Sequence, residues 1–385
     1  MDSRVIVLKG EDPYRTTIKA LQQFPLPDLK GRRVLVKPNA ARLAIPGDGV
    51  TTHPEVVEAA IDHLKEKGAG AIAIGESCIF GVDPESAFRA TGMREVSEKK
   101  RVELIDFDRL APMEIKIPGG KALKSIRVPA ILKKFDFIIS IPVMKTHMHT
   151  RVTLSIKNMK GLLWRREKAR LHQLRSDGKF AQGDKTLDIA ISDMASVLFP
   201  HLGIIDGTTG LEGMGPAYGR KKEAGLIVIG NNAVSADAVA ARLMGFHPEE
   251  VPHLRLLAER GLGEIQYSNL SIRPKDFFKW ETHFEPPPSR LSFSFPDIVV
   301  HDEGSCSACL STLFILLHHH KDLLASHRLR DDKIHIGIGK HLENIPRGTL
   351  LIGNCAKKMK KIGLFVQGCP PVASEILRSL QSKGV

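Results

Sequence analysis

The sequence is poor in aromatic residues and has no apolar run long enough to span a membrane. Phe, Trp and Tyr make up 5% of the 385 residues, which argues against a surface that stacks nucleic-acid bases. The longest obvious apolar stretch, 310–317, includes Ser311 and Thr312 and falls far short of the about 20 residues that a membrane helix needs. The N-terminus leads straight into the strand-like run 5–8, without the apolar segment of a signal peptide. These absences predict a cytoplasmic protein without a membrane span and make nucleic acid the less favoured class of partner.

Cysteine is scarce, and its distribution is uneven. Five cysteines are too few for a disulfide scaffold in a chain of this length, and clustered thiols in a cytosolic protein are typical of metal or redox sites. Cys78 is remote from the others and is typical of a small buried thiol, with a nucleophile or an additional ligand as the alternative. The other four lie within the last 80 residues, at Cys306, Cys309, Cys355 and Cys369.

Positive charge clearly exceeds negative charge. The chain has 56 Lys and Arg against 43 Asp and Glu, a formal net charge of +13. Such an excess attracts anions, and the shortage of aromatic residues favours phosphorylated or carboxylated small molecules or acidic protein partners over nucleic acid. The apolar and charged fractions, 42% and 26%, are ordinary for a globular protein and exclude global disorder.

Strand-like and helix-like segments alternate along the chain, which is the pattern of an α/β fold with a largely parallel sheet. Pro54 suits the first turn of a helix that ends before Gly68, and Thr52 suits its N-cap. A further helix is expected at 236–244. The strands of this body are expected at 33–37, 71–75, 136–141, 202–206 and 226–230.

Three consecutive prolines, 286–288, cannot continue a helix or a central strand and indicate a linker. We therefore divide the chain into a body at 1–284, a linker at 285–296 and a C-terminal module at 297–385. The expected fold is a largely parallel α/β body plus a smaller C-terminal α/β module that carries four cysteines. In that module, strands are expected at 297–300, 333–338, 349–352 and 362–366, and helices at 310–324 and 372–380.

The four distal cysteines follow the expected strands that end at Val300, Ile352 and Val366. Because the carboxyl ends of parallel strands share one edge of a sheet, the sulfurs can meet there. Four thiolates bind zinc or an iron–sulfur cluster. Structural zinc usually uses two Cys-x2-Cys pairs and this chain has one, so a [4Fe–4S] cluster is favoured, with zinc and unliganded thiols as alternatives. The segments 353–355 and 368–371 also resemble cluster loops in the small subunits of hydrogenases.

Polar residues also follow the strands of the body, where a parallel sheet would bring them to one anion-binding cleft. Lys145, His147 and Glu76 are the candidate acid–base groups. The stretch 206–216 is rich in glycine, but it is neither a P-loop nor a dinucleotide fingerprint. The expected substrate-binding residues are Lys37, Asn39, His149, Lys157, Asn158, Lys160, Asp206, Glu212, Gly213 and Gly215.

Each of these interpretations has a plainer alternative. The segment 151–185 holds ten Lys or Arg and three Asp or Glu, and it could be a solvated basic helix. Asp206 and Glu212 could satisfy loop amides. The run 318–320 is not a metal site, because successive helix residues diverge by ~100°. The basic run 357–361 could dock an acidic electron carrier such as a ferredoxin, or be a solvated turn.

The order of these motifs resembles the family catalogued as domain of unknown function 362, over about residues 30–250. The family has no generally established reaction. Many members carry an iron–sulfur module, commonly with the closely spaced cysteines of bacterial ferredoxins, whereas the cysteines here are spread over an α/β unit. The matching segments are 34–39, 52–57, 74–77, 142–147, 157–161, 206–216 and 236–240.

Three classes of function follow from these features. The first is an iron–sulfur oxidoreductase or electron-transfer protein that acts on an anionic small molecule in the body cleft. The second is a non-redox acid–base enzyme (an isomerase, racemase or lyase) with a structural or Lewis-acid cluster. The third is a scaffold for a metal centre, or an RNA-binding protein that uses the segment 151–185.

Overall fold

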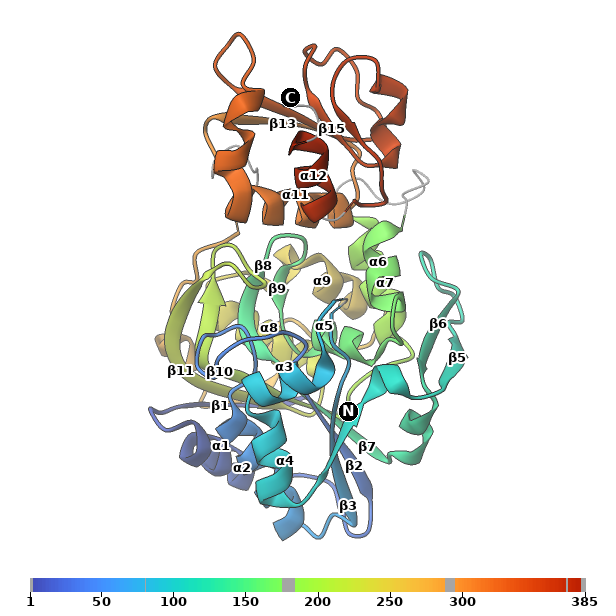
Figure 1. Cartoon of the computed structure of the whole chain (residues 1–385). Helices are drawn as coiled ribbons and strands as arrows, with labels where there is room; N and C mark the ends of the chain where they lie inside the picture. The colour runs from blue at the N-terminus through green and yellow to red at the C-terminus, as the bar shows by residue number, and fades with distance from the viewer. Residues whose placement is uncertain (1–2, 80, 175–183, 288–294, 372, 382–385) are drawn as a thin grey trace. The chain divides into compact units, whose positions relative to one another are not determined.

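The computed structural model describes residues 3–79, 81–174, 184–287, 295–371 and 373–381. It divides into two compact units, shown in Figure 1. The body comprises Met1–Lys168 and Lys179–Pro287, and the C-terminal unit comprises Ala169–Gly178 and Pro288–Val385. Parts of the basic segment (175–183) and of the expected linker (288–294) lie outside the described residues. No helix in the described ranges is both long and apolar enough to cross a membrane.

The body contains a ten-stranded sheet within the described residues, ordered β12-β1-β11-β10-β7-β2-β3-β4, with β8 beside β10 and β9 beside β8. The strands β4, β3, β2, β7 and β10 pair in parallel, whereas β11 is antiparallel to both β10 and β1. The bounds are β1 (Arg4–Lys9), β2 (Arg33–Pro38), β3 (Ala71–Glu76), β4 (Glu103–Asp106), β7 (Phe137–Ile141), β8 (Val143–His147), β9 (Arg151–Thr153), β10 (Leu202–Glu212), β11 (Arg220–Gly230) and β12 (Ser271–Arg273).

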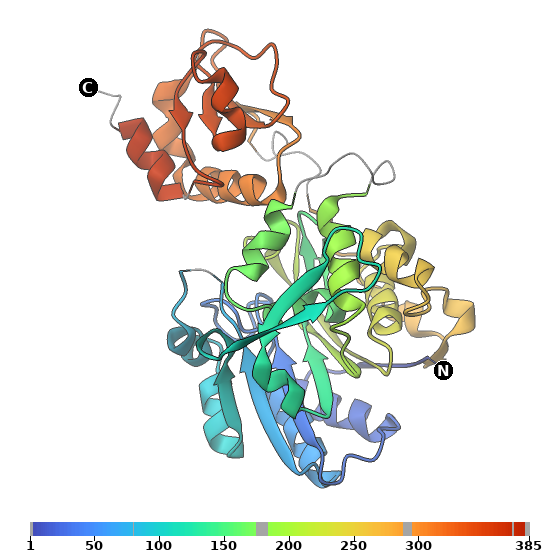
Figure 2. The same cartoon turned by 90° about the vertical axis from the view of Figure 1, so that its right-hand side faces the viewer.

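Helices cover both faces of this sheet. Val34 and Val36 of β2 pack with α1, α2, α3 and α4, while the alternating Leu35 belongs to the opposite face. On that face α8 packs against β10 and β11. The hairpin of β5 (Pro112–Lys116) and β6 (Ser125–Pro129) is a separate sheet that faces the viewer in Figure 2. The helices are α1 (Pro13–Gln23), α2 (Pro54–Glu66), α3 (Pro84–Ala90), α4 (Met93–Lys100), α5 (Ser155–Asn158), α7 (Thr186–Ala195), α8 (Ala233–Leu243) and α9 (Pro252–Glu259). A further helix, α6 (Glu167–Gln173), starts in the body, and its residues from Ala169 on belong to the C-terminal unit.

The structure confirms the α/β class and corrects three local expectations. Residues 207–212, which follow the expected strand 202–206, continue β10 and pair with β11 on both sides of a bulge between Gly207 and Thr209. Residues 143–147, which come directly after the expected strand 136–141, form a further strand, β8, because β10 and β9 supply pairing partners. The N-cap of α2 is His53, whose Nδ1 accepts the Glu55 N–H, while the Thr52 hydroxyl donates to Ile141 O instead.

The C-terminal unit has its own parallel sheet, ordered β13-β14-β15-β16. Leu313, Leu316 and Leu317 of α11 and Ile376 of α12 pack with this sheet in one core. A second α/β unit is therefore present. The bounds are β13 (Ile298–Glu303), β14 (Ile334–Gly339), β15 (Leu350–Ile352), β16 (Phe365–Val366), α11 (Ser307–His320) and α12 (Ala373–Gln381).

Candidate functional site

A buried ion pair lies where β2 and β3 end. Lys37 Nζ is 2.7 Å from Glu76 Oε2, and the two side chains are 0% and 1% exposed. Lys37 also donates to Pro38 O, and the Glu76 carboxylate accepts the N–H groups of Ala40 and Ser77. Burial lowers the pKa of Lys37, and the negative charge of Glu76 opposes that shift. The two strand ends therefore hold Glu76 as an anchor for Lys37.

Two asparagines connect this pair to Lys145. Asn158 Oδ1 accepts from Lys37 Nζ (3.2 Å) and from Asn39 Nδ2 (3.3 Å). Asn39 Oδ1 accepts from Lys145 Nζ (2.9 Å), which also donates to Val50 O (2.7 Å). Neither of these Lys145 acceptors carries a charge. One continuous hydrogen-bonded network thus joins five sequence-predicted residues from β2, the loop after it, β3, β8 and α5.

The short helix α5 presents Lys157 and Asn158 to this network, and Asp237 of α8 holds its start. The Asp237 carboxylate accepts the N–H groups of Ser155 (2.8 Å) and Ile156 (2.9 Å). Burial raises the pKa of Asp237 to about 7. Carboxylates at a helix N-terminus satisfy amides that have no partner within the helix. Asp237 is therefore a positioning residue, marked in the sequence only by its place in the motif 236–240.

Gly161 lies directly against the ion pair. A Cβ atom at this position would be 2.2 Å from Glu76 Oε1 and 2.5 Å from Lys37 Nζ. Contacts that short are not tolerated, so only glycine fits here without displacing the pair. The sequence shows this glycine at the end of the run 157–161, but its role depends on packing that the spacing does not reveal.

Further cations surround Lys145. Burial is the main cause that lowers the pKa of Lys145 to about 7, and the positive charge of the nearby Arg42 is the second. Burial also lowers the pKa values of Lys157 and Lys160 well below their ordinary value, and neighbouring lysines add to both shifts. Arg42 was not expected from the sequence; it follows β2 by four residues. We call this set the lysine site: Lys37, Asn39, Arg42, Glu76, Lys145, Lys157, Asn158 and Lys160.

The lysine site has more positive than negative groups. Its five cations are Lys37, Arg42, Lys145, Lys157 and Lys160, while the carboxylates that act on its lysines are Glu76 and Asp188. Glu76 is committed to Lys37. Uncompensated buried charge is costly, and a basic group responds by losing its proton or by acquiring an anion.

His147 and His149 lie near the end of β8 and are both buried. The His149 N–H donates to His147 Nδ1 at 3.1 Å, and the ring centroids are 5.5 Å apart. This hydrogen bond uses Nδ1 of His147 as the acceptor and places any proton of the neutral ring on Nε2.

Asp206 and Glu212 occupy structural positions and do not contact the residues of the lysine site. Asp206 accepts the His53 N–H at 2.7 Å, at the start of α2, and both the N–H and the hydroxyl of Thr208. Glu212 accepts the Glu285 N–H at 3.0 Å and pairs with Lys222 at 3.3 Å. These contacts agree with the alternative in which both acids satisfy loop amides.

Gly213 and Gly215 shape the turn beyond β10. Gly213 has φ 73 and donates to Glu285 O. A Cβ at Gly215 would lie 1.9 Å from Thr146 O, so this turn packs tightly on β8. Among the sequence-predicted residues, these two belong to the turn that supports β8 and have no contact with the network described above.

Cys78 is not a reactive thiol. It is buried, and desolvation raises its pKa to about 12. Lys168 Nζ lies close by but donates to Cys78 O, Ser77 Oγ and Asp108 Oδ2. Without a lowered pKa the thiolate is scarce at neutral pH.

In the C-terminal unit, the segments of the four distal cysteines follow β13, β15 and β16 at one edge of the parallel sheet. The Asn354 N–H donates to Gly368 O (2.7 Å), and Asn354 Oδ1 accepts the Gly368 N–H (3.0 Å). A Cβ at Gly353 would lie 3.4 Å from Cys309 Sγ. The segments of Cys355 and Cys369 are therefore joined, and that of Cys309 lies against them.

The thiols affect one another, but their arrangement is not that of a metal ligand set. A hydrogen bond with Cys309 lowers the pKa of Cys306 to about 6. The pKa of Cys309 is raised, first by that hydrogen bond, then by burial, and then by the other three thiols. Within the described ranges, no three His, Cys, Asp or Glu side chains are placed to hold a metal ion. The number and softness of the donors fit a cluster or zinc, and the four-cysteine centre stays a prediction.

A family model described as a domain of unknown function, DUF362, matches residues 34–242. The chain belongs to this family. The DUF362 region contains the whole lysine site and Asp237, and it ends before Pro288, where the larger segment of the C-terminal unit begins. A thylakoid-associated protein of Synechocystis is 26% identical over 238 residues, which cover 60% of this chain and 69% of that protein.

Proposed function

We propose that the DUF362 body binds an anionic small molecule, a carboxylate or a phosphate, at the lysine site. The observation that carries this proposal is the excess of buried basic groups: Lys145 and Lys157 are 3% and 8% exposed, and the two oxygen atoms that accept hydrogen bonds from Lys145 Nζ, Asn39 Oδ1 and Val50 O, are uncharged. A bound anion would supply the missing negative charge and restore protons to these amines.

The same site offers acid–base chemistry. With a pKa near 7, Lys145 has comparable amounts of the neutral and protonated forms at neutral pH. A neutral amine at this position can accept a proton from a bound molecule and return it. His147 is a second acid–base candidate, whereas Glu76 holds Lys37 and acts as a positioning residue.

We further propose that Cys306, Cys309, Cys355 and Cys369 hold a [4Fe–4S] cluster, with zinc as the alternative. The convergence of three cysteine segments at one sheet edge supports this. A bound cluster would supply one-electron transfer, which makes the chain an iron–sulfur oxidoreductase or electron-transfer protein of the cytoplasm. Its partner would be an acidic carrier such as a ferredoxin.

The second candidate is a non-redox acid–base enzyme, such as an isomerase, racemase or lyase. The lowered pKa of Lys145 favours it, because proton transfer at neutral pH needs no electron donor. In that case the C-terminal metal centre has a structural role. Turnover that survives when the cluster is held in one oxidation state would select this candidate over the first.

Thermal unfolding tests the anion proposal. Inorganic phosphate or succinate should raise the melting temperature of the full chain above that in chloride of equal ionic strength, because a ligand at 100 times its Kd stabilises by about 2.7 kcal/mol. The Lys145→Gln variant should lose this response. The matched control is Lys99→Gln, since Lys99 pairs with Glu58 at the surface. Equal responses in the two variants, or none in the wild type, would contradict the proposal.

Metal analysis tests the cluster. Anaerobically purified protein should contain about four iron and four sulfide per chain and give an electron paramagnetic resonance signal on reduction. The Cys309→Ser variant should lose most of the iron, and Cys78→Ser should keep it. A colourless protein that contains zinc would select the alternative metal and exclude the redox function.

A further inference from the structure

A cavity opens in the body at the edge strand β12. Its volume is about 800 Å³, within the range of small-molecule sites. It is lined by the end of α8, by β12 and by the short helices at Tyr267–Asn269 and Phe277–Trp280. Five strand spacings of about 4.8 Å separate β12 from β2, so this cavity lies about 24 Å along the sheet from the strand of Lys37.

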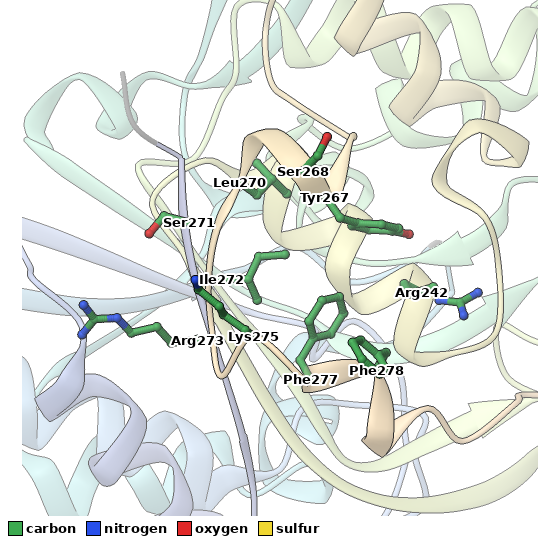
Figure 3. A pocket seen from close by; sticks show the side chains of 10 residues that line it. All are labelled: Arg242, Tyr267, Ser268, Leu270, Ser271, Ile272, Arg273, Lys275, Phe277 and Phe278. Atoms are coloured by element: carbon green, nitrogen blue, oxygen red, sulfur yellow. The ribbon is translucent and has the colours of Figure 1, made fainter.

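Aromatic rings form the wall of this cavity. The Tyr267 and Phe277 centroids are 6.0 Å apart in an edge-to-face arrangement, and Phe277 and Phe278 repeat it at 6.1 Å. Figure 3 shows the three rings together on one side of the cavity. Phe278 is 57% exposed, which is unusual for a large ring in a protein with few aromatic residues. Such a wall suits a flat apolar group.

The Tyr267 hydroxyl is buried and, among the described residues, has no hydrogen-bond partner. Its pKa is raised, chiefly by burial, so the hydroxyl keeps its proton and remains a donor. A buried hydroxyl without a partner is unfavourable, and a ligand oxygen would supply the missing acceptor.

The cavity is positively charged. Arg242 pairs with Glu281 at 2.9 Å, and the nearby Asp276 pairs with Lys279. Arg273 and Lys275 also line the cavity, and neither has a carboxylate partner among the residues that the structure describes. Unpaired cations beside an aromatic wall complement a ligand that has both a flat ring and a negative charge.

We propose that this aromatic pocket (Arg242, Tyr267, Arg273, Lys275, Phe277 and Phe278) binds a planar aromatic anion. The ring packs on Phe277 and Phe278, the Tyr267 hydroxyl donates to a polar atom of the ligand, and Arg273 and Lys275 bind its negative group. This site is separate from the lysine site and does not depend on the function proposed for it.

A fluorescent probe tests the pocket on the full chain. The native protein should bind one molecule of 8-anilinonaphthalene-1-sulfonate per chain. The Kd of this probe should be at least five times lower than that of N-phenyl-1-naphthylamine, which lacks the sulfonate. Higher salt should narrow that difference, because the two exposed cations are screened. Absence of sulfonate binding, or equal affinity for the two probes, would overturn the proposal.

Substitutions locate the probe. The Kd of the sulfonate should rise at least fivefold in the Arg273→Gln/Lys275→Gln double variant and in Phe278→Ala, and at least twofold in Tyr267→Phe. The matched control is Lys279→Gln, which removes a charge from the same short helix without changing the pocket lining. Tyr267→Phe should melt no lower than the wild type, because it removes an unpartnered hydroxyl. Binding unchanged in all pocket variants would place the probe elsewhere and overturn the proposal.

Discussion

The body and the C-terminal unit hold their candidate groups in different ways. In the body, side chains fix one another: Glu76 holds Lys37, and two asparagines extend the network to Lys145. In the C-terminal unit, the main chain does most of this work: the sheet topology and the hydrogen bond from the Asn354 N–H to Gly368 O align the cysteine segments, and the Asn354 side chain adds one contact. A site held by side chains should lose stability on a single substitution even when no ligand is bound. A site held by the main chain should keep its fold after a single substitution and lose only the ability to bind its ligand.

The largest effect is expected from breaking the buried ion pair. Lys37→Met leaves Glu76 buried and unpaired, which should lower the free energy of unfolding by about 3–5 kcal/mol in urea titrations. Adding Glu76→Gln should recover part of the loss. Lys99→Met, which removes a lysine side chain that is 64% exposed, should cost at most about 1 kcal/mol. Similar losses for Lys37→Met and Lys99→Met would show that the pair does not stabilise the body.

Gly161→Ala should be the next most damaging change. Its Cβ would overlap Glu76 Oε1 and Lys37 Nζ, and overpacking of this kind costs about 1–3 kcal/mol. The comparison variant is Gly47→Ala, where no atom lies within 4 Å but φ is 86, so that only backbone strain is added. If Gly161→Ala has the same urea midpoint as the wild type, the backbone at Gly161 can move away from the Lys37–Glu76 pair.

The pH dependence of stability should report on Lys145. Its pKa is about 7 in the folded state and near the ordinary 10.5 in the unfolded state, so between these values the unfolded state binds more protons. Its contribution to stability therefore rises with pH in that window, by up to about 1.4 kcal/mol per unit. Lys145→Gln should flatten the slope relative to the wild type. An identical slope in both proteins would mean that the amine stays protonated.

The smallest effect is expected in the C-terminal unit. Cys369 is exposed, so Cys369→Ser should change the free energy of unfolding of metal-free protein by no more than about 0.5 kcal/mol. The same variant should reduce the iron content of anaerobically purified protein. A loss of 2 kcal/mol without metal would show that this segment, like the lysine site, depends on side-chain contacts.

Much of the fold could be predicted from the sequence, because buried parallel strands are continuous apolar runs. The apolar runs in the sequence predicted the positions of β2, β3 and β7 directly. The far half of β10 was missed, since its glycines and threonines are typical of a loop and its pairing with β11 is a long-range property. His53 also replaced the expected Thr52 as the cap of α2, because the Thr52 hydroxyl finds a partner on β7.

The site was predicted in part. Strand ends located Lys37, Glu76 and Lys145, because parallel topology alone brings such positions together. Arg42 and Gly161 were missed as site residues, since their roles arise from loop paths and close packing. The cysteine segments lie at the expected edge, but the geometry of the thiols depends on side-chain packing and cannot be obtained from spacing.

The amide side chains of Asn39 and Asn158 determine how easily the net charge of the lysine site could change. Asn39 and Asn158 have nearly the shape of aspartate, so the surplus of cations is not imposed by the space available. Exchanging a single nitrogen for oxygen, as in Asn39→Asp, would place an internal counterion 2.9 Å from the Lys145 amine. Such a chain would be self-neutralising, and its melting temperature should no longer respond to phosphate or succinate. On the proposed function, the replacement of one atom would therefore separate a site that binds an anion from one that no longer needs it.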